Sequence, residues 1–550
     1  MQASVRSLVS RWLQNSALRH KRFRRFYLGS VGTAFGYTMQ ATVAAWLMAT
    51  LTPSALMVAL VQTASTAPSL LFGLIAGTLA DIVDRRRVVL VTQVLLLSGT
   101  LAFAGATLAG MIGPSSLLAL TFLIGLGFTF YIPAQQALVN DLVPRVDLPP
   151  AVALAAVAFN GARAAGPALA GAIAAWLGSG SALLASALFF VWMIFALRGW
   201  PNPTPSIPGI PETLLSGIQS GLRYVRHSLP LRALIIRNLG FSICASALWA
   251  LLPVVARDQL GLGAGGFGML VAVFGAGAVV GALWIPRHLQ KMSLNTVVTW
   301  GYLLWIAAVS IIAAAPFVAV AVVGTCAAGA AWVSVLATLS AGTQSSAPGW
   351  VRARAVSTNL VANQASLALG SVIWGALASA AGTRIALAVS AGVMLVLLGL
   401  TRRVRVALGE EADVTGVQLP EFAIPVEPMP DDGPVLIQVE YRIAPQDRDV
   451  FLRAIYAIEP TRRRNGASYW RVYRDLEDEG RFVERFVITS WAEYVRLRAR
   501  MTVAERRLQV RVRQLHRSAT PIRVSRLIGV SPDAADTARD AAATDSPART

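Results

Sequence analysis

Asp81-Ile82-Val83-Asp84-Arg85-Arg86-Arg87 decides the fold, because this stretch separates two long runs that contain no charged residue. The first run covers 26–80 and the second covers 88–140. A charge-free run of about 55 residues fits two membrane-spanning helices of about 20 residues each, joined by a short turn. The charged stretch between the runs must then lie in water. This pattern predicts a polytopic membrane protein.

The composition of the whole chain supports the same class. The 550 residues are 55% hydrophobic and only 14% charged, which excludes an ordinary soluble protein of this length. A net charge of +20 is typical of nucleic-acid binding, but here the basic residues flank apolar runs. Membrane topology explains such a distribution better, so we expect a lipid bilayer and no nucleic acid as partner.

Turns and charges divide the apolar runs into twelve expected helices. We expect them at 26–50, 54–80, 88–111, 115–140, 150–177, 181–199, 233–256, 264–286, 295–315, 317–345, 354–381 and 384–401. Basic residues are concentrated in alternate connections, which predicts a plasma-membrane protein with both termini in the cytoplasm. An offset of 204 residues aligns Gly166 with Gly370 and Gly171 with Gly375, which indicates two repeats of six helices.

The segments outside the spans complete the expected organisation. We expect a basic cytoplasmic N-terminus at 1–25, an N-terminal half at 26–199, a linker at 200–232, a C-terminal half at 233–401, a second linker at 402–433, a soluble tail domain at 434–530 and a disordered end at 531–550. Five apolar residues of the first linker fall on one helix face, namely Leu214, Leu215, Ile218, Leu222 and Val225. Such a face fits a helix at the membrane surface, and the alternative is a simple soluble linker helix.

The stretch from Gly77 to Arg87 resembles the loop after the second helix of the major facilitator superfamily, which typically reads Gly-x-x-x-Asp-Arg/Lys-x-Gly-Arg-Arg/Lys. Ile82 and Asp84 depart from that pattern. The Asp-Arg-Arg variant is similar to the branch that contains enterobactin exporters and transmembrane secretion effectors. The resemblance covers about residues 20–405. It implies a secondary-active transporter that exports a small organic molecule, such as a siderophore, drug or secondary metabolite, by alternating access; an importer is the alternative.

The resemblance also implies a latch on the cytoplasmic side between the second and eleventh helices. Asp81 would meet the positive end of the eleventh helix and the arginines at its start. Alternatively, the charges of the loop only fix the topology. The residues expected in this gating motif are Gly77, Asp81, Asp84, Arg85, Arg86, Arg87, Arg352 and Arg354.

Arg163 is the only charged residue between Leu148 and Leu197, so it lies within the expected fifth helix. A charge inside the membrane is costly, which makes it a candidate for function. Small residues and a proline follow it and permit close packing and a kink, so packing alone is the alternative. The residues of this helix-5 motif are Asn160, Arg163, Gly166, Pro167 and Gly171.

The other strongly polar side chains of the spans should face the bundle interior, where they either contact substrate or hold helices together. The candidates for the substrate path are Gln40, Gln62, Gln135, Gln136, Asn359, Asn363 and Gln364. No Asp or Glu lies in the middle of an expected span, so coupling to protons must use Asp81, Asp141 or Asp258, or be absent. We expect no cofactor and no metal site, since no cluster of ligand residues is visible.

The tail domain is predicted to have the order βαββαβ, which is ferredoxin-like. Its expected strands are 435–441, 468–474, 482–488 and 522–524, and its expected helices are 446–460 and 491–516. The tail looks like the small domains of antibiotic-biosynthesis monooxygenases, which usually pair as dimers. We expect a regulatory or dimerising module that pairs two copies of the chain as a homodimer, and no enzyme, since no catalytic group of residues is visible. The alternative is a transporter fused to a small monooxygenase-like enzyme domain that oxidises the transported molecule. Trp470, Tyr473 and Trp491 favour core packing over an aromatic pocket.

Overall fold

The computed structural model describes residues 17–198, 214–289, 292–401, 411–417, 424, 427–518 and 520–530. The predicted disordered end at 531–550, residues 1–16 of the predicted N-terminus and parts of both linkers lie outside these residues. The side chain of Asp81 is likewise outside the description, although its backbone is helical. Contacts divide the chain into two compact units. Unit 1 comprises 1–214, 233–342 and 357–407, and unit 2 comprises 215–232, 343–356 and 408–550.

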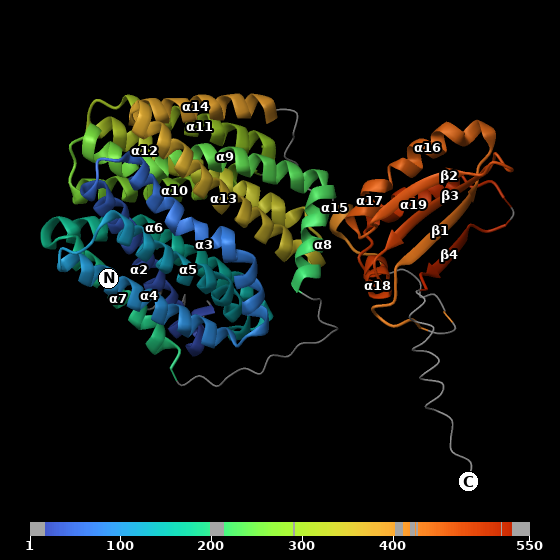
Figure 1. Ribbon diagram of the computed structural model, residues 1–550, viewed down its shortest axis with the longest axis horizontal. Coiled ribbons are helices and arrows are strands. Elements are labelled where there is room, and N and C mark those ends of the chain that lie inside the picture. Colours follow the sequence, from blue (N-terminus) through green and yellow to red (C-terminus); the bar gives the residue numbers. More distant parts are fainter. Residues whose placement is uncertain are drawn as a thin grey trace, which may run out of the picture. The chain divides into compact units, whose positions relative to one another are not determined.

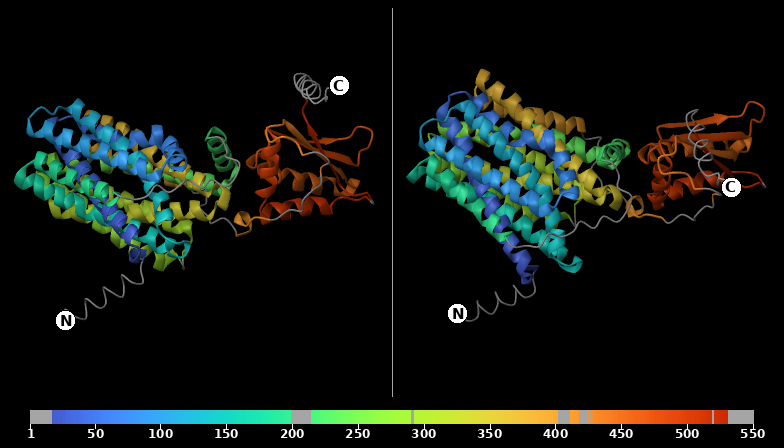
Figure 2. Two further views of the ribbon diagram at one scale, coloured as in Figure 1. Left: turned by 90° about the horizontal axis from the view of Figure 1, so that it is seen from below. Right: turned by 60° about the horizontal axis from the view of Figure 1, so that its bottom comes forward.

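Unit 1 is a bundle of long helices, which run alongside one another in Figures 1 and 2. Its N-terminal half contains α2 (Lys21–Leu51), α3 (Ala55–Ile82), α4 (Arg85–Leu108), α5 (Pro114–Leu142), α6 (Leu148–Leu177) and α7 (Ser179–Ala196). Its C-terminal half contains α9 (Leu229–Val254), α10 (Ala264–Leu289), α11 (Leu294–Ala314), α12 (Val318–Ser345), α13 (Gly349–Ala381) and α14 (Thr383–Leu400). Some of these helices begin or end in unit 2.

The predicted all-α membrane fold is confirmed. Every expected span corresponds to one long helix, and eleven helices of the described residues are long and apolar enough to cross a membrane. The helix outside that set is α2, whose charge-free part contains uncharged polar residues such as Thr38, Gln40 and Thr42. A π-helical turn, Val255–Gln259, continues α9 beyond its predicted end.

The two halves end their fifth helices in the same way. Gly178 follows α6 and Gly382 follows α13, and their φ angles are +86° and +91°. This conformation favours glycine, so each residue ends one helix and turns the chain directly into the next. The two glycines are separated by the same offset of 204 residues that aligns the repeats in the sequence.

Corresponding glycines also pack against corresponding first helices within each half. A β-carbon at Gly166 of α6 would collide with Thr38 of α2, and one at Gly370 of α13 would collide with Ser246 of α9. Small residues therefore let the first and fifth helix of each half approach closely. The parallel contacts support the arrangement of two six-helix repeats.

Unit 2 contains the predicted tail domain, an antiparallel sheet in the order β2-β3-β1-β4. The strands are β1 (Val435–Arg442), β2 (Tyr469–Arg474), β3 (Arg481–Ile488) and β4 (Arg523–Ile528). The helices are α16 (Arg448–Tyr456), α17 (Glu459–Arg464), α18 (Trp491–Ala499) and α19 (Val503–Gln514). This is the predicted ferredoxin-like order, with helices between β1 and β2 and between β3 and β4.

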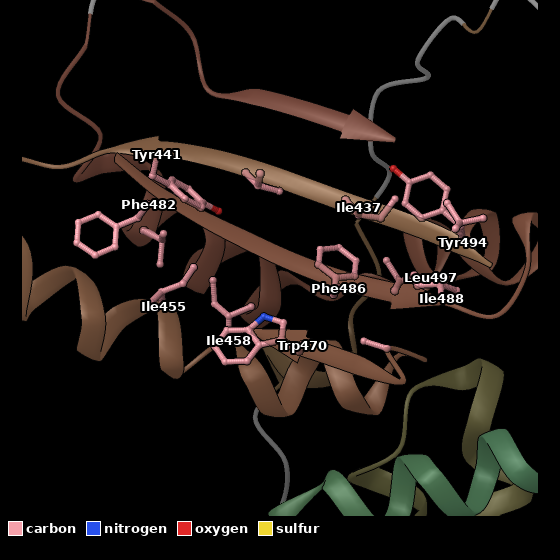
Figure 3. Packing of buried hydrophobic residues seen from close by; sticks show 14 of the residues in the cluster. Ile437, Tyr441, Ile455, Ile458, Trp470, Phe482, Phe486, Ile488, Tyr494 and Leu497 are labelled. Carbon is pink, nitrogen blue, oxygen red and sulfur yellow. The ribbon is translucent and has the colours of Figure 1, made fainter. Parts of the chain in front are cut away.

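The core of the tail domain lies between the sheet and its helices. Ile455, Ile458, Trp470 and Phe486 point into the same space in Figure 3 and are at most 2% exposed. Along β1, buried residues alternate with partly exposed ones, as expected for a sheet with one covered face.

Both predicted helices of the tail domain are divided in the structure. The expected helix 446–460 is α16 and the beginning of α17, with a break at Ala457 and Ile458. The expected helix 491–516 is two helices, α18 and α19, which are interrupted around Met501. The side chain of Thr502 accepts a hydrogen bond from the backbone of Glu505, and the Glu505 side chain accepts one from the backbone of Thr502. This reciprocal capping box starts a new helix at Val503.

The predicted helix of the first linker is α8 (Leu214–His227), whose described side chains belong to unit 2. The expected apolar face is only partly correct, because Val225 is buried but Leu222 is 57% exposed. Tyr224, which the sequence interpretation did not use, is buried in place of Leu222. The side chains of 214–220 lie outside the description.

Candidate functional site

Arg163 lies near the middle of α6 and marks the centre of the candidate site. Its guanidinium carbon is 5.9 Å from the ring centre of Phe159 on the same helix and 5.6 Å from that of Trp249 on α9. Both halves of unit 1 therefore contribute to the surroundings of this charge. The guanidinium has no hydrogen bond and no ion pair to any residue that the structure describes.

Aromatic rings extend from Arg163 into both halves. In the N-terminal half Tyr37 of α2 stacks on Phe128 of α5 with ring centres 3.7 Å apart. In the C-terminal half Trp249 meets Phe274 of α10 edge to face at 4.7 Å. Tyr37, Phe128 and Trp249 are only half-buried, so each leaves part of its ring uncovered. Such rings can hold the flat, apolar body of a small molecule.

The buried donors without an acceptor among the described residues include Nε2 of Gln40 and Nε1 of Trp249. Gln40 lies about one turn beyond Tyr37 on α2 and is 1% exposed. A buried donor without a partner costs about 1–3 kcal/mol, so a ligand or water that supplies the acceptor is stabilising there. Gln40 therefore stays a candidate for the substrate path.

The two halves approach most closely through small residues. A β-carbon at Gly171 of α6 would lie 2.9 Å from Cα of Gly268 on α10. On the other side of the bundle, a β-carbon at Gly375 of α13 would collide with Ala59 of α3. Gly171 and Gly375 are the residues that the offset of 204 aligns, so the helix-5 motif has a packing role in both repeats.

These contacts lie toward the end of the bundle that is farthest from the basic loops, which we call the opposite end. At the opposite end Nη1 of Arg257 donates to the carbonyl oxygen of Thr52 at 3.0 Å, and the amide of Leu56 donates to Oγ of Ser379 at 2.9 Å. Both hydrogen bonds join the two halves. The opposite end is therefore closed in this conformation.

Asn359 and Asn363 belong to a buried polar network between α9 and α13. Nδ2 of Asn238 donates to Oδ1 of Asn359 at 2.8 Å, and Nδ2 of Asn363 donates to Oγ of Ser242 at 2.7 Å. The Ser242 hydroxyl donates in turn to Oδ1 of Asn238 at 3.0 Å. Every amide here has partners on the neighbouring helix, which favours holding helices together over contacting substrate.

The remaining polar candidates differ in their exposure. Gln62, Gln135 and Gln364 are half-buried, whereas Gln136 and Asn160 are exposed. Their contact with substrate stays a prediction. Pro167 is buried within α6, and its carbonyl oxygen lies next to Gly268.

The gating motif holds the helices of the N-terminal half together at the basic end. Oδ1 of Asp84 accepts from the backbone amide of Arg86 at 3.0 Å and caps α4. Nη1 of Arg85 lies 2.7 and 2.8 Å from the carboxylate oxygens of Asp141 on α5. Nε of Arg86 donates to the carbonyl oxygen of Leu197 at 3.1 Å. The loop therefore has a structural role in joining α4, α5 and the end of α7.

The other residues of the gating motif make fewer contacts with the N-terminal half. Arg87 is mostly exposed and 3.6 Å from Asp84, and Gly77 has no atom near its β-position. In unit 2, Nε of Arg352 donates to the carbonyl oxygen of Ala347 at 3.3 Å, and Arg354 packs against Gly221 of α8. The latch through Asp81 stays a prediction, since the side chain of Asp81 is not described.

Comparison with known proteins identifies the family. A family model described as "Transmembrane secretion effector" matches residues 13–533. The chain belongs to this family. The matched region extends beyond residue 405, where the sequence resemblance ended, and includes the tail domain.

This secretion-effector chain is similar to a curated transporter and to solved structures. The multidrug efflux pump Tap of Mycolicibacterium fortuitum is 27% identical over 358 residues, which are 61% of this chain and 84% of Tap. A bacterial homologue of the human lysosomal transporter Spinster, inward-facing and unoccupied, has a TM-score of 0.58 at 14% identity over 70% of this chain and 97% of its own. The nucleoside transporter NupG has a TM-score of 0.57 at 13% identity over 70% and 98%. The structural likeness shows the major facilitator fold.

Sequence reasoning on this secretion effector missed two buried polar residues near the start of α9. Arg237 is 1% exposed, its guanidinium lies over Tyr302 at 6.0 Å, and Nη2 donates to Asn295 at 3.4 Å. Asn238, 2% exposed, is the centre of the amide network described above. The adjacent residues Arg237 and Asn238 lie inside the predicted span 233–256, and two polar residues there could have indicated a buried polar cluster.

The tail domain of the secretion effector uses its buried carboxylate structurally. Glu484 of β3 is 0% exposed and accepts from Nε of Arg462 at 2.9 Å, from Nε1 of Trp470 at 3.0 Å and from the Tyr441 hydroxyl at 3.1 Å. Burial, together with the negative charge of Glu484, raises the pKa of Tyr441, so its hydroxyl stays protonated.

The three aromatic residues considered for a pocket in the tail do not form one. Trp470 and Trp491 are core residues, 1% and 5% exposed, as the favoured interpretation predicted. Tyr473 is 43% exposed and lies on the uncovered face of the sheet. Nδ1 of His516 accepts from the backbone amide of Arg442 at 2.9 Å, which is a structural role.

Proposed function

We propose that this transmembrane secretion effector is a secondary-active exporter of small organic molecules that works by alternating access. The position of Arg163 carries the proposal, because a charge in the middle of α6 faces Trp249 of the other half. A group at the boundary between two halves can meet substrate in either orientation of the halves. The likeness to Tap, named a multidrug efflux pump, supports export over import.

We further propose that the protein lies in the plasma membrane with both termini in the cytoplasm. The basic residues Arg85, Arg86 and Arg87 lie at one end of the bundle, and basic loops mark the cytoplasmic side. The closed opposite end would then face outward. Two of the three carboxylates considered for proton coupling are ion-paired, Asp141 with Arg85 and Asp258 with Arg257.

The direction of transport is tested by accumulation of candidate drugs and siderophores in cells with and without the gene. Export lowers intracellular accumulation when the protein is present. Higher accumulation would instead establish import, the alternative direction. An Arg163→Gln protein of equal abundance separates transport from effects of expression.

The latch hypothesis gives a specific prediction for Asp81. Asp81→Asn should lower the transport rate about ten-fold or more, since a charge-assisted hydrogen bond contributes about 1.5–3 kcal/mol. Asp147→Asn is the matched control for losing a carboxylate at the same end, because Asp147 pairs with Arg19 inside one half. The measurement is substrate flux at equal protein abundance. Wild-type flux in Asp81→Asn would remove the latch.

For the tail domain we propose a regulatory role rather than an enzymatic one. Within unit 2, Nη2 of Arg223 on α8 donates to Oε1 of Glu493 at 3.0 Å. Glu493 also accepts from Arg496 at 3.0 Å and from Arg500 at 3.3 Å. The Arg500 guanidinium lies 4.1 Å from the ring centre of Trp350 in the first turn of α13. The tail domain thus contacts two segments that continue into membrane helices.

Glu493→Gln should loosen α8 from the tail domain. An amide cannot neutralise three arginines, so we expect a loss of about 2 kcal/mol and roughly 30-fold faster amide exchange in α8. The matched control is Glu479→Gln, because the side chain of Glu479 is 86% exposed. A changed transport rate supports regulation. Unchanged exchange would contradict the contact, and unchanged transport with faster exchange would contradict regulation.

A homodimer through the tail domain is a second proposal for the same module. The uncovered face of the sheet carries Tyr469 and Tyr473, which are 40% and 43% exposed. A partly aromatic face suits contact with a second copy better than free exposure to water. The oligomeric state of the full chain in detergent, compared with a protein lacking 406–550, tests this proposal.

A further inference from the structure

Arg163 is a half-buried cation in the middle of a helical bundle, and its partners are unusual. Charges in such positions are almost always paired with a carboxylate or with backbone carbonyls. Here the described residues provide only the faces of two aromatic rings, Phe159 and Trp249. An aromatic face stabilises a guanidinium by about 0.5–2 kcal/mol and leaves its N–H donors unused. The site therefore offers donors for an anion.

Two polar side chains on the helices that border α6 near Arg163 also have unused donors. Nε1 of Trp249 and Nε2 of Gln40 are buried donors without an acceptor among the described residues. Both nitrogens can only donate, so a ligand that satisfies them must bring acceptor atoms. A carboxylate, phenolate or enolate supplies such acceptor atoms. It also supplies the negative counter-charge that the described residues do not provide for Arg163. A cationic ligand would be repelled by the Arg163 guanidinium and would find hydrogen-bond donors where it needs acceptors.

The two repeats differ at this position. The offset of 204 residues that aligns the glycines places Leu367 of α13 opposite Arg163 of α6. The positive charge is therefore contributed by the N-terminal half alone. The aromatic surface comes from both halves, from Tyr37 and Phe159 on one side and from Trp249 on the other.

From these observations we propose that Arg163 is the recognition point for the anionic group of the transported molecule. The substrate is an organic anion with a flat aromatic body. Its acidic group receives hydrogen bonds from the Arg163 guanidinium in bidentate geometry. Its ring system lies against Tyr37 and Trp249. This inference rests on the proposed transport function and adds the chemical class of the substrate.

The test uses three probes of one shape and different charge: 2-naphthoate, its neutral amide 2-naphthamide and the cation 2-naphthylmethylammonium. Binding to the full chain in detergent is measured by calorimetry, and flux is measured in inverted membrane vesicles. The wild-type protein should bind 2-naphthoate about ten-fold or more tightly than 2-naphthamide, as expected for one charge-assisted pair. Arg163→Gln should abolish that preference, and Arg163→Lys should retain part of it. Arg384→Gln, an exposed arginine at the start of α14, is the matched control and should bind as the wild type does.

The binding results test the anion site, and the flux results test the transport function. Wild-type binding that favours the amide or the cation, or that is equal for all three probes or absent, overturns the anion site. An unchanged preference in folded Arg163→Gln protein, judged by its elution and thermal unfolding, overturns it as well. Selective binding without flux of 2-naphthoate would count against transport of such anions and leave the recognition site standing.

Discussion

Gly268→Leu should abolish transport while leaving the bundle folded. A β-carbon at Gly268 would lie 2.5 Å from the carbonyl oxygen of Pro167 and 2.8 Å from Cα of Gly171. Both atoms belong to the backbone of α6, so no flexible side chain can move aside. Overpacking of this kind costs about 1–3 kcal/mol or more, and 3 kcal/mol corresponds to roughly 100-fold in the population of the closed state.

The penalty applies only when α6 and α10 are in contact, so the substitution selects against closure of the opposite end of the bundle. A transporter that cannot close that end cannot complete its cycle. Gly105→Leu is the matched control, because Gly105 of α4 is exposed and has no atom within 4 Å of its β-position. Flux in vesicles measures the loss.

A second measurement tests the conformational cause. The Thr63 hydroxyl on α3 donates to the carbonyl oxygen of Ala368 on α13 at 3.0 Å, which covers this residue when the halves are closed. A cysteine at position 63 should react faster with a membrane-impermeant maleimide in the Gly268→Leu protein. Normal flux together with an unchanged labelling rate would contradict the role of this contact.

The helices could be predicted from the sequence because charge and hydropathy mark them directly. The two charge-free runs on either side of Asp81–Arg87 contain α2 to α5, and the observed ends differ from the expected ones by a few residues. Extra length at the basic ends, as at Lys21 in α2, carries charged residues that a membrane span excludes. Hydropathy therefore locates the buried part of a helix but not its extension into water.

The break between α18 and α19 could also have been predicted. Thr502-Val503-Ala504-Glu505 has the capping-box spacing, with Thr at the first position and Glu three residues later. The surrounding residues have continuous helical character, and that periodicity concealed the signal. The capping box thus starts a new helix even though the residues on both sides of it have a favourable helix propensity.

The environment of the candidate site could not be predicted from the sequence. Arg163 was identified as a charge inside a span, but its aromatic neighbour Trp249 is distant in the chain and lies in the other half. Likewise Asn359 and Asn363 appeared as candidates for substrate contact, and only the tertiary structure shows their hydrogen bonds with Asn238. A polar residue in a span predicts that a partner exists, and the fold determines which one.

Glu484→Gln should strongly destabilise the tail domain. The carboxylate of Glu484 is fully buried and accepts hydrogen bonds from Arg462, Trp470 and Tyr441. The amide keeps the size of the side chain but leaves the guanidinium of Arg462, which is 8% exposed, without a counter-charge. Breaking a buried pair in this way costs about 3–5 kcal/mol. Hydrogen exchange of the β1 and β3 amides in the full chain should accelerate by roughly 100-fold or more.

A double substitution distinguishes the pair from its individual members. Replacing Glu484 and Arg462 together by Leu and Met removes both charges, and such replacements of a buried pair are often neutral or stabilising. We therefore expect the double variant to recover most of the protection that Glu484→Gln loses. Equal loss in both variants would show that Trp470 and Tyr441, rather than the ion pair, depend on the carboxylate. Recovery would show that the stability of the domain depends on the mutual neutralisation of Glu484 and Arg462, which is a structural role for the most buried acid of the tail domain.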